Sequence, residues 1–203
     1  MHSQPAGPTP DTQPGDHVRA YEVLHPVARG GMASVLAVRD TRTGERRGMK
    51  LLLPLSSGEE ARARFRREFR SMSRLHHPSI LEVYEWGWHG DRPWFTMELL
   101  EGRNLRDEIE SWSQLAPQVR YERAEDVLMQ ITRGLAYIHA RGLVHRDVTP
   151  ANIMVLTDGR VKIMDFGVVK DMRAEMTQVG EVIGTVAYIS PEPIPGNPVD
   201  ARA

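Results

Sequence analysis

The chain has 203 residues, with 26 Lys and Arg against 27 Asp and Glu, so its formal net charge is −1. This length suffices for one substantial core, and the balanced charge argues against a surface built throughout for nucleic acid or an anionic membrane. The absence of cysteine excludes disulfides, Cys-ligated metal centres and a cysteine nucleophile. No apolar run is long enough to span a membrane, and the N-terminus lacks the basic-then-apolar layout of a secretory signal, so we expect a cytoplasmic protein with no membrane segment.

Residues 1–16 are rich in proline, glycine and small polar side chains and show no aliphatic periodicity. Such a segment cannot bury enough apolar surface to offset its ordering entropy, so we expect a disordered tail. The pattern then becomes typical of β-strands over 21–28, 34–39 and 47–53, with a hairpin turn at 41–44.

The period changes to that of a helix over residues 59–75, where the apolar side chains fall on one stripe, namely Ala61, Phe65, Phe69, Met72 and Leu75. Two further strands are expected at 80–86 and 94–99, joined by a turn at Gly90 and Asp91. The first part of the chain is therefore predicted to be an antiparallel sheet with one helix.

The second part is predicted to be mainly helical, with a short helix over 104–112 and a long one over 122–141 that ends at Gly142. Two short strands, 153–156 and 161–164, follow a loop, and the last forty or so residues have a loop-like composition. The expected fold class is α+β.

Two strings carry candidate chemistry in this second part. Asp147 precedes Asn152 by five residues on a loop between a helix and a strand, where the Asp can accept a proton and the Asn can hold a cation. Asp165 begins an Asp-Phe-Gly string at a strand end, a position suited to Mg²⁺. The alternative for each string is an ordinary turn in which these side chains bond the local backbone.

Two further features lie in the first part. Gly30 and Gly31 occupy a predicted hairpin, where backbone N–H groups can approach phosphates, although a plain flexible hairpin has the same composition. Lys50, one of three lysines in the chain, lies within a strand and suits a phosphate oxygen. Glu68 on the following helix is its candidate counter-ion, and the alternative is that both are ordinary surface charges.

The order of these features resembles that of protein kinases. It runs from a glycine hairpin through a strand lysine and a helix glutamate to a His-Arg-Asp loop with Asn, and then to Asp-Phe-Gly. From about residue 21 onward the chain resembles a bacterial eukaryotic-like (Hanks-type) serine/threonine protein kinase. The resemblance implies a two-lobed protein-kinase-like fold in a domain over 17–203. Its N-terminal sheet lobe would span about 20–99, the hinge about 98–102, and the partial helical C-terminal lobe about 103–203. Because the chain ends at Ala203, we expect a catalytic domain truncated at its C-terminus.

The resemblance also implies residue roles. Asp147 would be the catalytic base, Lys50 would bind the α- and β-phosphates of ATP and pair with Glu68, and Asn152 and Asp165 would hold Mg²⁺, or alternatively Mn²⁺. The nucleotide would further contact residues of the hairpin, strands and hinge: Val27, Gly30, Gly31, Val35, Gly48, Met97, Glu98, Leu100 and Met154. An apolar column would contain Met72, Val83, His145 and Phe166, and the activation-loop phosphorylation sites would be Thr177 and Thr185.

These roles imply an ATP-dependent serine/threonine protein kinase in signal transduction. It would phosphorylate proteins, including its own activation loop through self-association, and would not bind nucleic acid. The arginines of 62–74 are accordingly interpreted as a solvated helix face. One alternative is a truncated or pseudokinase-like nucleotide-binding or interaction module, because Ala28, Ala33, Gly48 and Thr149 depart from the family pattern. At position 48 the departure is expected to loosen packing over adenine. A small-molecule phosphotransferase is the other alternative, and the Asp-Phe-Gly string and residues 184–192, which resemble a polypeptide-presenting loop, argue against it.

Overall fold

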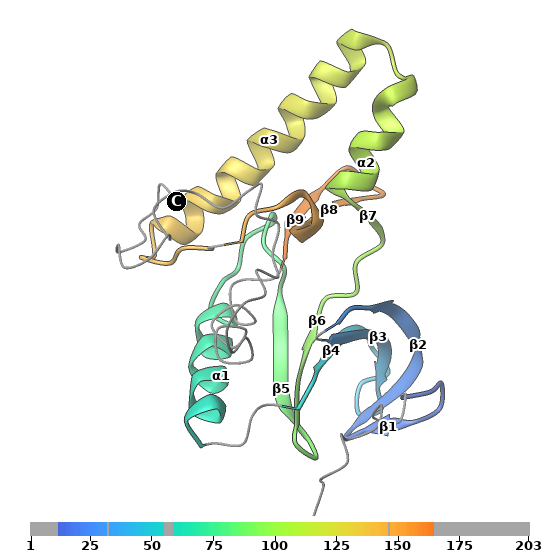
Figure 1. The fold of residues 1–203 in the computed structure, drawn as a ribbon, viewed down its shortest axis with the longest axis vertical. Coiled ribbons are helices and arrows are strands. Elements are labelled where there is room, and N and C mark those ends of the chain that lie inside the picture. Colours follow the sequence, from blue (N-terminus) through green and yellow to red (C-terminus); the bar gives the residue numbers. More distant parts are fainter. Residues whose placement is uncertain (1–11, 32, 55–58, 146, 165–203) are drawn as a thin grey trace, which may run out of the picture. The chain divides into compact units, whose positions relative to one another are not determined.

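The computed structural model describes residues 12–31, 33–54, 59–145 and 147–164 (Figure 1). The chain divides into two compact units. The first, called here the sheet unit, contains Met1–Leu55 and Tyr84–Leu99, and the second, the helical unit, contains Ser56–Val83 and Leu100–Ala203. The helix at 59–72, which the sequence analysis counts with the sheet, thus belongs by its contacts to the helical unit.

Six strands form the sheet unit in the order β1-β2-β3-β4-β6-β5 (Figure 1). The pairs from β1 to β4, and β4 with β6, are antiparallel, as predicted. The register between β2 and β3 shifts at two places, between Val23 and His25 and between Pro26 and Ala28, so this pair carries bulges. The strands are β1 (His17–Val18), β2 (Tyr21–Arg29), β3 (Ala33–Asp40), β4 (Arg46–Leu52), β5 (Val83–His89) and β6 (Arg92–Met97).

One apolar cluster forms the core of the sheet unit, and it alternates along the strands with residues of the other face, as side chains in a sheet must. Leu36, Met49 and Trp94 contribute to it from three adjacent strands. Its members are Val18, Tyr21, Val23, Leu36, Val38, Met49, Leu51 and Trp94. The opposite face of the central strands is therefore available for another role.

The predicted hairpin turn at 41–44 is confirmed, with Gly44 in the left-handed region at φ 79°. Asp40 is fully buried at the start of this turn, and Arg42 donates to both of its carboxylate oxygens at 2.7 and 2.9 Å. Arg42 also donates to Glu85 at 2.8 Å, and Tyr21 donates to Glu85 at 2.9 Å. Hydrogen bonds from Arg42 lower the pKa of Asp40 to about 2.

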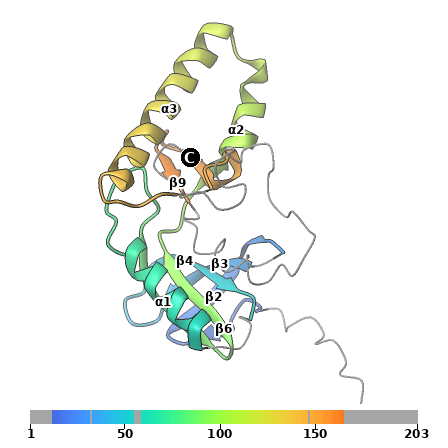
Figure 2. The ribbon, with the colours of Figure 1, turned by 60° about the vertical axis from the view of Figure 1, so that its left-hand side comes forward.

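Three α-helices, two 3-10 helices and a small sheet are described in the helical unit. Figure 2 shows the long α3 beside α2. The sheet has the order β7-β8-β9 and is antiparallel. The elements are α1 (Glu59–Met72), β7 (Gly102–Asn104), α2 (Leu105–Ser111), η1 (Trp112–Gln114), α3 (Pro117–His139), η2 (Pro150–Asn152), β8 (Ile153–Leu156) and β9 (Val161–Ile163). One core cluster of this unit contains Leu75, Ile80, Leu105, Trp112, Val127, Ile131, Ile138, Ile153, Val161 and Ile163.

Element boundaries differ from the predicted ones where tertiary contacts decide them. Helix α3 begins at Pro117, five residues before the predicted start, because proline fits the first turn of a helix. Strand β5 begins at Val83 and not at residue 80, since Ile80 forms a parallel bridge with Ile163 and packs in the helical core. Strands β1 and β7 were not predicted, since two or three residues are too few to show an apolar alternation.

The last residues of the predicted tail, 12–16, are described and are tied to β2. The Gly15 N–H donates to Val23 O, and the Val23 N–H donates to Asp16 O, each at 2.8 Å. Within the described part of the chain, no helix is both long and apolar enough to cross a bilayer. The loop-like composition of the last forty residues concerns positions outside the described residues.

Candidate active site

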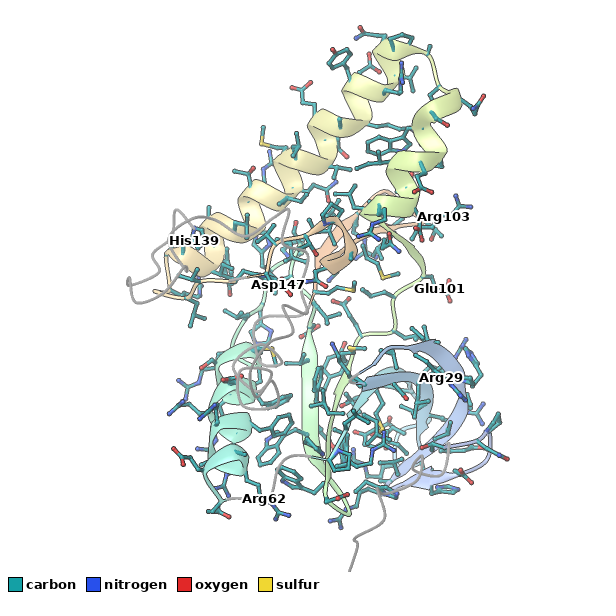
Figure 3. The ribbon with its side chains drawn as sticks, viewed as in Figure 1. Arg29, Arg62, Glu101, Arg103, His139 and Asp147 are labelled. Atoms are coloured by element: carbon teal, nitrogen blue, oxygen red, sulfur yellow. The ribbon has the colours of Figure 1, made fainter. Side chains whose placement is uncertain are left out.

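The loop between α3 and β8 carries Asp147 (Figure 3). Helix α3 ends just before it, and Gly142 takes a left-handed conformation at φ 70°, which confirms the predicted glycine stop. The Leu143 N–H bonds back to Ile138 O at 3.1 Å, and Ile138 is fully buried. A buried helix end therefore fixes the start of this loop.

Asp147 and Asn152 lie together, as their spacing predicted. The Asn152 Nδ2 donates to the carboxylate oxygen Oδ2 of Asp147 at 3.0 Å and to its backbone oxygen at 2.9 Å. The Asn152 N–H donates to Thr149 O at 2.9 Å, which closes the turn at η2. Both side chains are half-buried. Since the amide nitrogen is committed to Asp147, the Asn152 side-chain oxygen is the atom left to accept from a donor or to ligate a cation.

His145 links the loop to the strand that follows it. Its Nε2 donates to Met164 O at 2.8 Å, and its Nδ1 accepts from the Asp147 N–H at 3.3 Å. The ring is 1 % exposed, so these bonds satisfy polar atoms that water does not reach. The resemblance implies an apolar column that contains His145 and does not indicate this bridge, because a sequence pattern carries no information on hydrogen-bond partners.

Strand β9 is anchored on its other side by the segment that follows α1. The Ile163 N–H donates to Ser79 O at 2.9 Å, and the Leu81 N–H donates to Ile163 O at 3.0 Å. Lys162 is buried and donates to Ile80 O at 3.4 Å. The backbone that leads toward Asp165 is therefore held from both sides within the helical unit.

In the sheet unit, the predicted nucleotide contacts share one face. Val35 is paired with Lys50 and Gly48 with Met97, across the strands β3, β4 and β6. Directly paired residues point to the same face of a sheet, as do residues two apart on one strand. Val35, Gly48, Lys50 and Met97 therefore lie on the face opposite the apolar core, and Lys50 is 8 % exposed.

Gly48 permits a close approach of Met97. A Cβ at position 48 would lie 3.1 Å from Met97 Cγ and 3.3 Å from Glu98 O, so an alanine there would require Met97 to shift. Within the sheet unit the Met97 side chain fills the space beside Gly48. Looser packing over adenine stays a prediction.

The hairpin between β2 and β3 carries the two predicted glycines. The Gly30 N–H donates to Ala33 O at 2.9 Å, which closes the hairpin, and Gly31 is exposed. Val27 is 49 % exposed near the end of β2. An exposed apolar side chain and an exposed glycine backbone are suited to covering a ligand.

The remaining predicted residues fall into separate groups. Glu68 is half-buried on α1, whereas Lys50 belongs to the sheet unit, so their pairing stays a prediction. Met154 lies in β8, paired with Lys162 and Asn104, and its adenine contact with Val35 and Gly48 also stays a prediction. Glu98 and Leu100 are half-buried and lie either side of the boundary between the units. Asp165, Thr177 and Thr185 lie outside the described residues, as do Arg146 and Phe166.

Each unit by itself offers donors of the kind that a nucleotide with a divalent cation uses. Lys50 offers a buried positive charge, and Asn152 and Asp147 offer amide and carboxylate oxygens, which hard cations such as Mg²⁺ prefer. Among the described residues, no group of three or more His, Asp or Glu side chains forms a protein-only metal cage. The carboxylate of Asp147 and the amide oxygen of Asn152 are ligands of the kind that Mg²⁺ takes alongside substrate phosphates.

Comparison with known proteins gives consistent matches. The profile of the family described as "Protein kinase domain" matches residues 21–203. A probable serine/threonine-protein kinase of Streptomyces coelicolor is 40 % identical over 191 residues, which is 90 % of this chain and 28 % of that protein. The serine/threonine-protein kinase PknB of Mycobacterium tuberculosis is 36 % identical over 200 residues, which is 95 % of this chain and 31 % of that protein. The chain thus spans less than a third of the length of these relatives.

Solved structures give the same result for the fold. The crystal structure of the PknI kinase domain from M. tuberculosis superposes with a TM-score of 0.73 and 28 % sequence identity. The match covers 95 % of this chain and 70 % of that domain. The predicted combination of an antiparallel sheet with a partial helical part is confirmed.

Proposed function

The chain belongs to the protein kinase family, and on this premise we propose that it is an ATP-dependent serine/threonine protein kinase. It transfers the γ-phosphate of ATP to Ser and Thr hydroxyls of proteins. The proposal is supported by curated relatives named as serine/threonine-protein kinases and by the two groups of polar residues described above.

The observation that carries the proposal is the fixed geometry of Asp147. Asn152 holds its carboxylate at 3.0 Å and His145 contacts its backbone N–H at 3.3 Å, so the carboxylate is oriented before any substrate arrives. A preoriented carboxylate can accept the proton of a substrate hydroxyl as the oxygen attacks phosphorus. Thr149 lies in the same loop and is buried. We assign the proton transfer to Asp147 and not to Thr149.

The proposed cofactors are ATP and Mg²⁺, with Mn²⁺ as an alternative cation. ATP would supply the phosphoryl group, and the cation bound with it would neutralise the charge of the phosphates. Asn152 and Asp165 hold the cation, and Lys50, paired with Glu68, binds the phosphates. Adenine is held by Val27, Gly30, Gly31, Val35, Gly48, Met97, Glu98, Leu100 and Met154.

The proposed partners are proteins with Ser or Thr acceptors and a second copy of the chain, which phosphorylates the activation loop at Thr177 and Thr185. We place the kinase domain at 17–203, after a proline-rich tail whose last residues, 12–16, bond to β2, with the hinge at about 98–102. We also assign the protein to signal transduction in the cytoplasm. The site supports transfer to a hydroxyl group and does not indicate which protein carries that hydroxyl.

The test is a transfer assay with radiolabelled ATP and a general protein acceptor, followed by phosphoamino-acid analysis. Label is expected on phosphoserine and phosphothreonine, and it should disappear with EDTA and return with Mg²⁺. A Lys50→Met variant should lose most of the transfer, because methionine keeps the volume and removes the charge.

Lys162→Met is the matched control, because Lys162 is likewise buried in a strand but bonds the Ile80 backbone. Thermal unfolding compares its fold stability with that of the wild type, and per folded molecule its transfer should match that of the wild type. Label on tyrosine alone, or equal transfer by the wild type and Lys50→Met, contradicts the proposal.

A further inference from the structure

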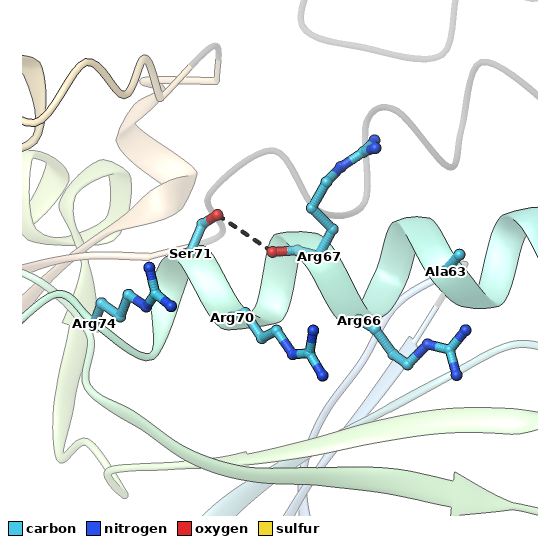
Figure 4. A pocket seen from close by; sticks show the side chains of 6 residues that line it. All are labelled: Ala63, Arg66, Arg67, Arg70, Ser71 and Arg74. Carbon is cyan, nitrogen blue, oxygen red and sulfur yellow. Dashed lines mark hydrogen bonds between the residues drawn. The ribbon is translucent and has the colours of Figure 1, made fainter.

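The face of α1 opposite its buried stripe is unusually rich in arginine. Ala61, Phe65, Phe69 and Met72 are buried. Successive residues of a helix are turned by about 100°, so Arg67, Arg70 and Arg74 lie on the side opposite Phe65. A hollow of about 550 Å³ lies on this side (Figure 4). The residues that line it are Ala63, Arg66, Arg67, Arg70, Ser71 and Arg74.

Three of these arginines have no anionic partner among the described residues. Arg66 is neutralised by Glu59 at 2.6 Å. Arg67, Arg70 and Arg74 are exposed, and their side chains form no hydrogen bond or ion pair with any residue that the structure describes. Ser71 donates to the Arg67 backbone oxygen at 3.2 Å, which leaves the guanidinium groups unengaged (Figure 4).

This arrangement does not serve helix stability. Residues three and four apart on a helix are neighbours, and like charges at this spacing destabilise it by about 0.2–0.5 kcal/mol per pair. Arg67 and Arg70 are three apart, and Arg70 and Arg74 are four apart. An anion seated among them would relieve this repulsion, and guanidinium groups match a phosphate by paired, charge-assisted hydrogen bonds.

We propose that Arg67, Arg70 and Arg74 form a binding site for phosphorylated serine or threonine segments of proteins. A phosphorylated side chain carries close to two negative charges and three acceptor oxygens, for which three flexible arginines on one helix face offer donors. We choose this partner over nucleic acid because the site is short. The row of arginines covers only about two helical turns, and Glu59 and Glu60 lie on the same helix.

The origin of such a ligand rests on the proposed function, because a protein kinase produces phosphorylated Ser and Thr. A site that retains a phosphorylated segment would favour substrates that already carry one phosphate. Binding itself requires no catalysis, so it can be measured in the Asp147→Asn variant. A failure of the binding proposal is therefore distinguished from a failure of the proposed kinase activity.

The experiment uses the full chain carrying Asp147→Asn, without ATP. The probe is a fluorescein-labelled peptide of alanine and glycine with one central phosphothreonine, and binding is followed by anisotropy. We expect saturable binding that weakens with salt, and about tenfold weaker binding when Arg67, Arg70 and Arg74 are all changed to Gln. Inorganic phosphate should compete, since it presents the same oxygens.

The matched control changes Arg106, Arg120 and Arg133 to Gln, which removes the same charge from exposed positions of the same unit. This variant should bind like its parent, and circular dichroism should show both triple variants folded. Equal binding of the unphosphorylated peptide, equal loss in both triple variants, or no binding overturns the proposal. Tighter binding of a single-stranded RNA oligonucleotide than of the phosphopeptide also overturns it, in favour of a nucleic-acid site.

Discussion

The carboxylate of Asp147 is held in place by a neighbour that retains a second function. Asn152 uses its amide nitrogen for two bonds to Asp147, and its side-chain oxygen remains for a cation. One residue therefore connects the proposed base with the proposed metal site. This dual role explains why an asparagine serves here better than an aspartate, which has no N–H to donate.

Changing Asn152 to Ala removes both bonds to Asp147 and the cation ligand. We expect kcat to fall by about 100-fold, the order of loss that follows misplacement of a reacting group. Asn152→Asp should restore cation binding only in part and leave Asp147 beside a second carboxylate. Steady-state kinetics over a range of Mg²⁺ concentrations distinguish the two effects. A kcat within about twofold of the wild type for Asn152→Ala would show that this bond does not orient the base.

At the residue scale, the sequence was sufficient to predict that Asp147 and Asn152 lie together, because a short loop between two elements limits their separation. It was not sufficient to predict the bonds of His145 to Met164 and Asp147. Those bonds depend on where the backbone of β9 lies relative to the loop, which is decided by the tertiary contacts of Ile163 with Ser79 and Leu81.

The hairpin between β3 and β4 depends on a buried carboxylate. Asp40 is paired with Arg42, and these hydrogen bonds lower its pKa from the usual 3.8 to about 2. A group whose pKa is lower in the folded state stabilises the fold above its unfolded pKa, and this contribution is lost as the pH falls toward the folded pKa.

We therefore expect the stability of the sheet unit to decrease between about pH 4 and pH 2 partly through Asp40. The Asp40→Asn variant should be less stable than the wild type at pH 7, by about 1–2 kcal/mol, since Arg42 is half-exposed. The difference should shrink toward pH 2. Urea unfolding at several pH values, followed by tryptophan fluorescence, measures it. A difference that does not change with pH would contradict the assigned pKa.

Strand β7 depends on a glycine. A Cβ at Gly102 would meet the backbone of its partner strand β8, at 2.8 Å from Leu156 Cα, and a backbone cannot move aside as a side chain can. Gly102→Ala should therefore destabilise the helical unit by about 1–3 kcal/mol. Chemical denaturation followed by far-UV circular dichroism measures this loss.

Gly134 in α3 provides the comparison. A Cβ there would come closest to the terminal Cδ1 of Ile163, a side-chain end that can shift, and alanine favours a helix by about 1 kcal/mol over glycine. Gly134→Ala should thus change stability little. An equal loss for both variants would indicate that contact with the β8 backbone is not the cause.

The elements themselves were largely predictable, and their limits were not. Periodicity identified the strands and helices because each buries one face, as in α1 with Phe65 and Phe69. The start of β5 and the existence of β1 and β7 were missed. Ile80 has the composition of a strand residue, yet it packs in the helical core and pairs with Ile163, a long-range contact that no local pattern records.

At the scale of the whole molecule, family membership and fold follow from matches that cover most of the chain. The sheet unit presents Lys50 among the predicted nucleotide contacts, and the helical unit presents Asp147 with Asn152. Sequence order predicted both groups, because the kinase signature fixes which residue follows which. The arginine site on α1 was instead interpreted as a solvated face, since sequence alone does not show which charges are paired.

The central claim is that this chain transfers phosphate from ATP with Asp147 as the base. Single-turnover transfer to a protein acceptor, compared between the wild type and Asp147→Asn at saturating ATP and Mg²⁺, tests it most directly. We predict a rate about 10²–10⁴-fold lower for the variant, with unchanged thermal unfolding. Equal rates for the two proteins, or no transfer by the folded wild type, would contradict the account.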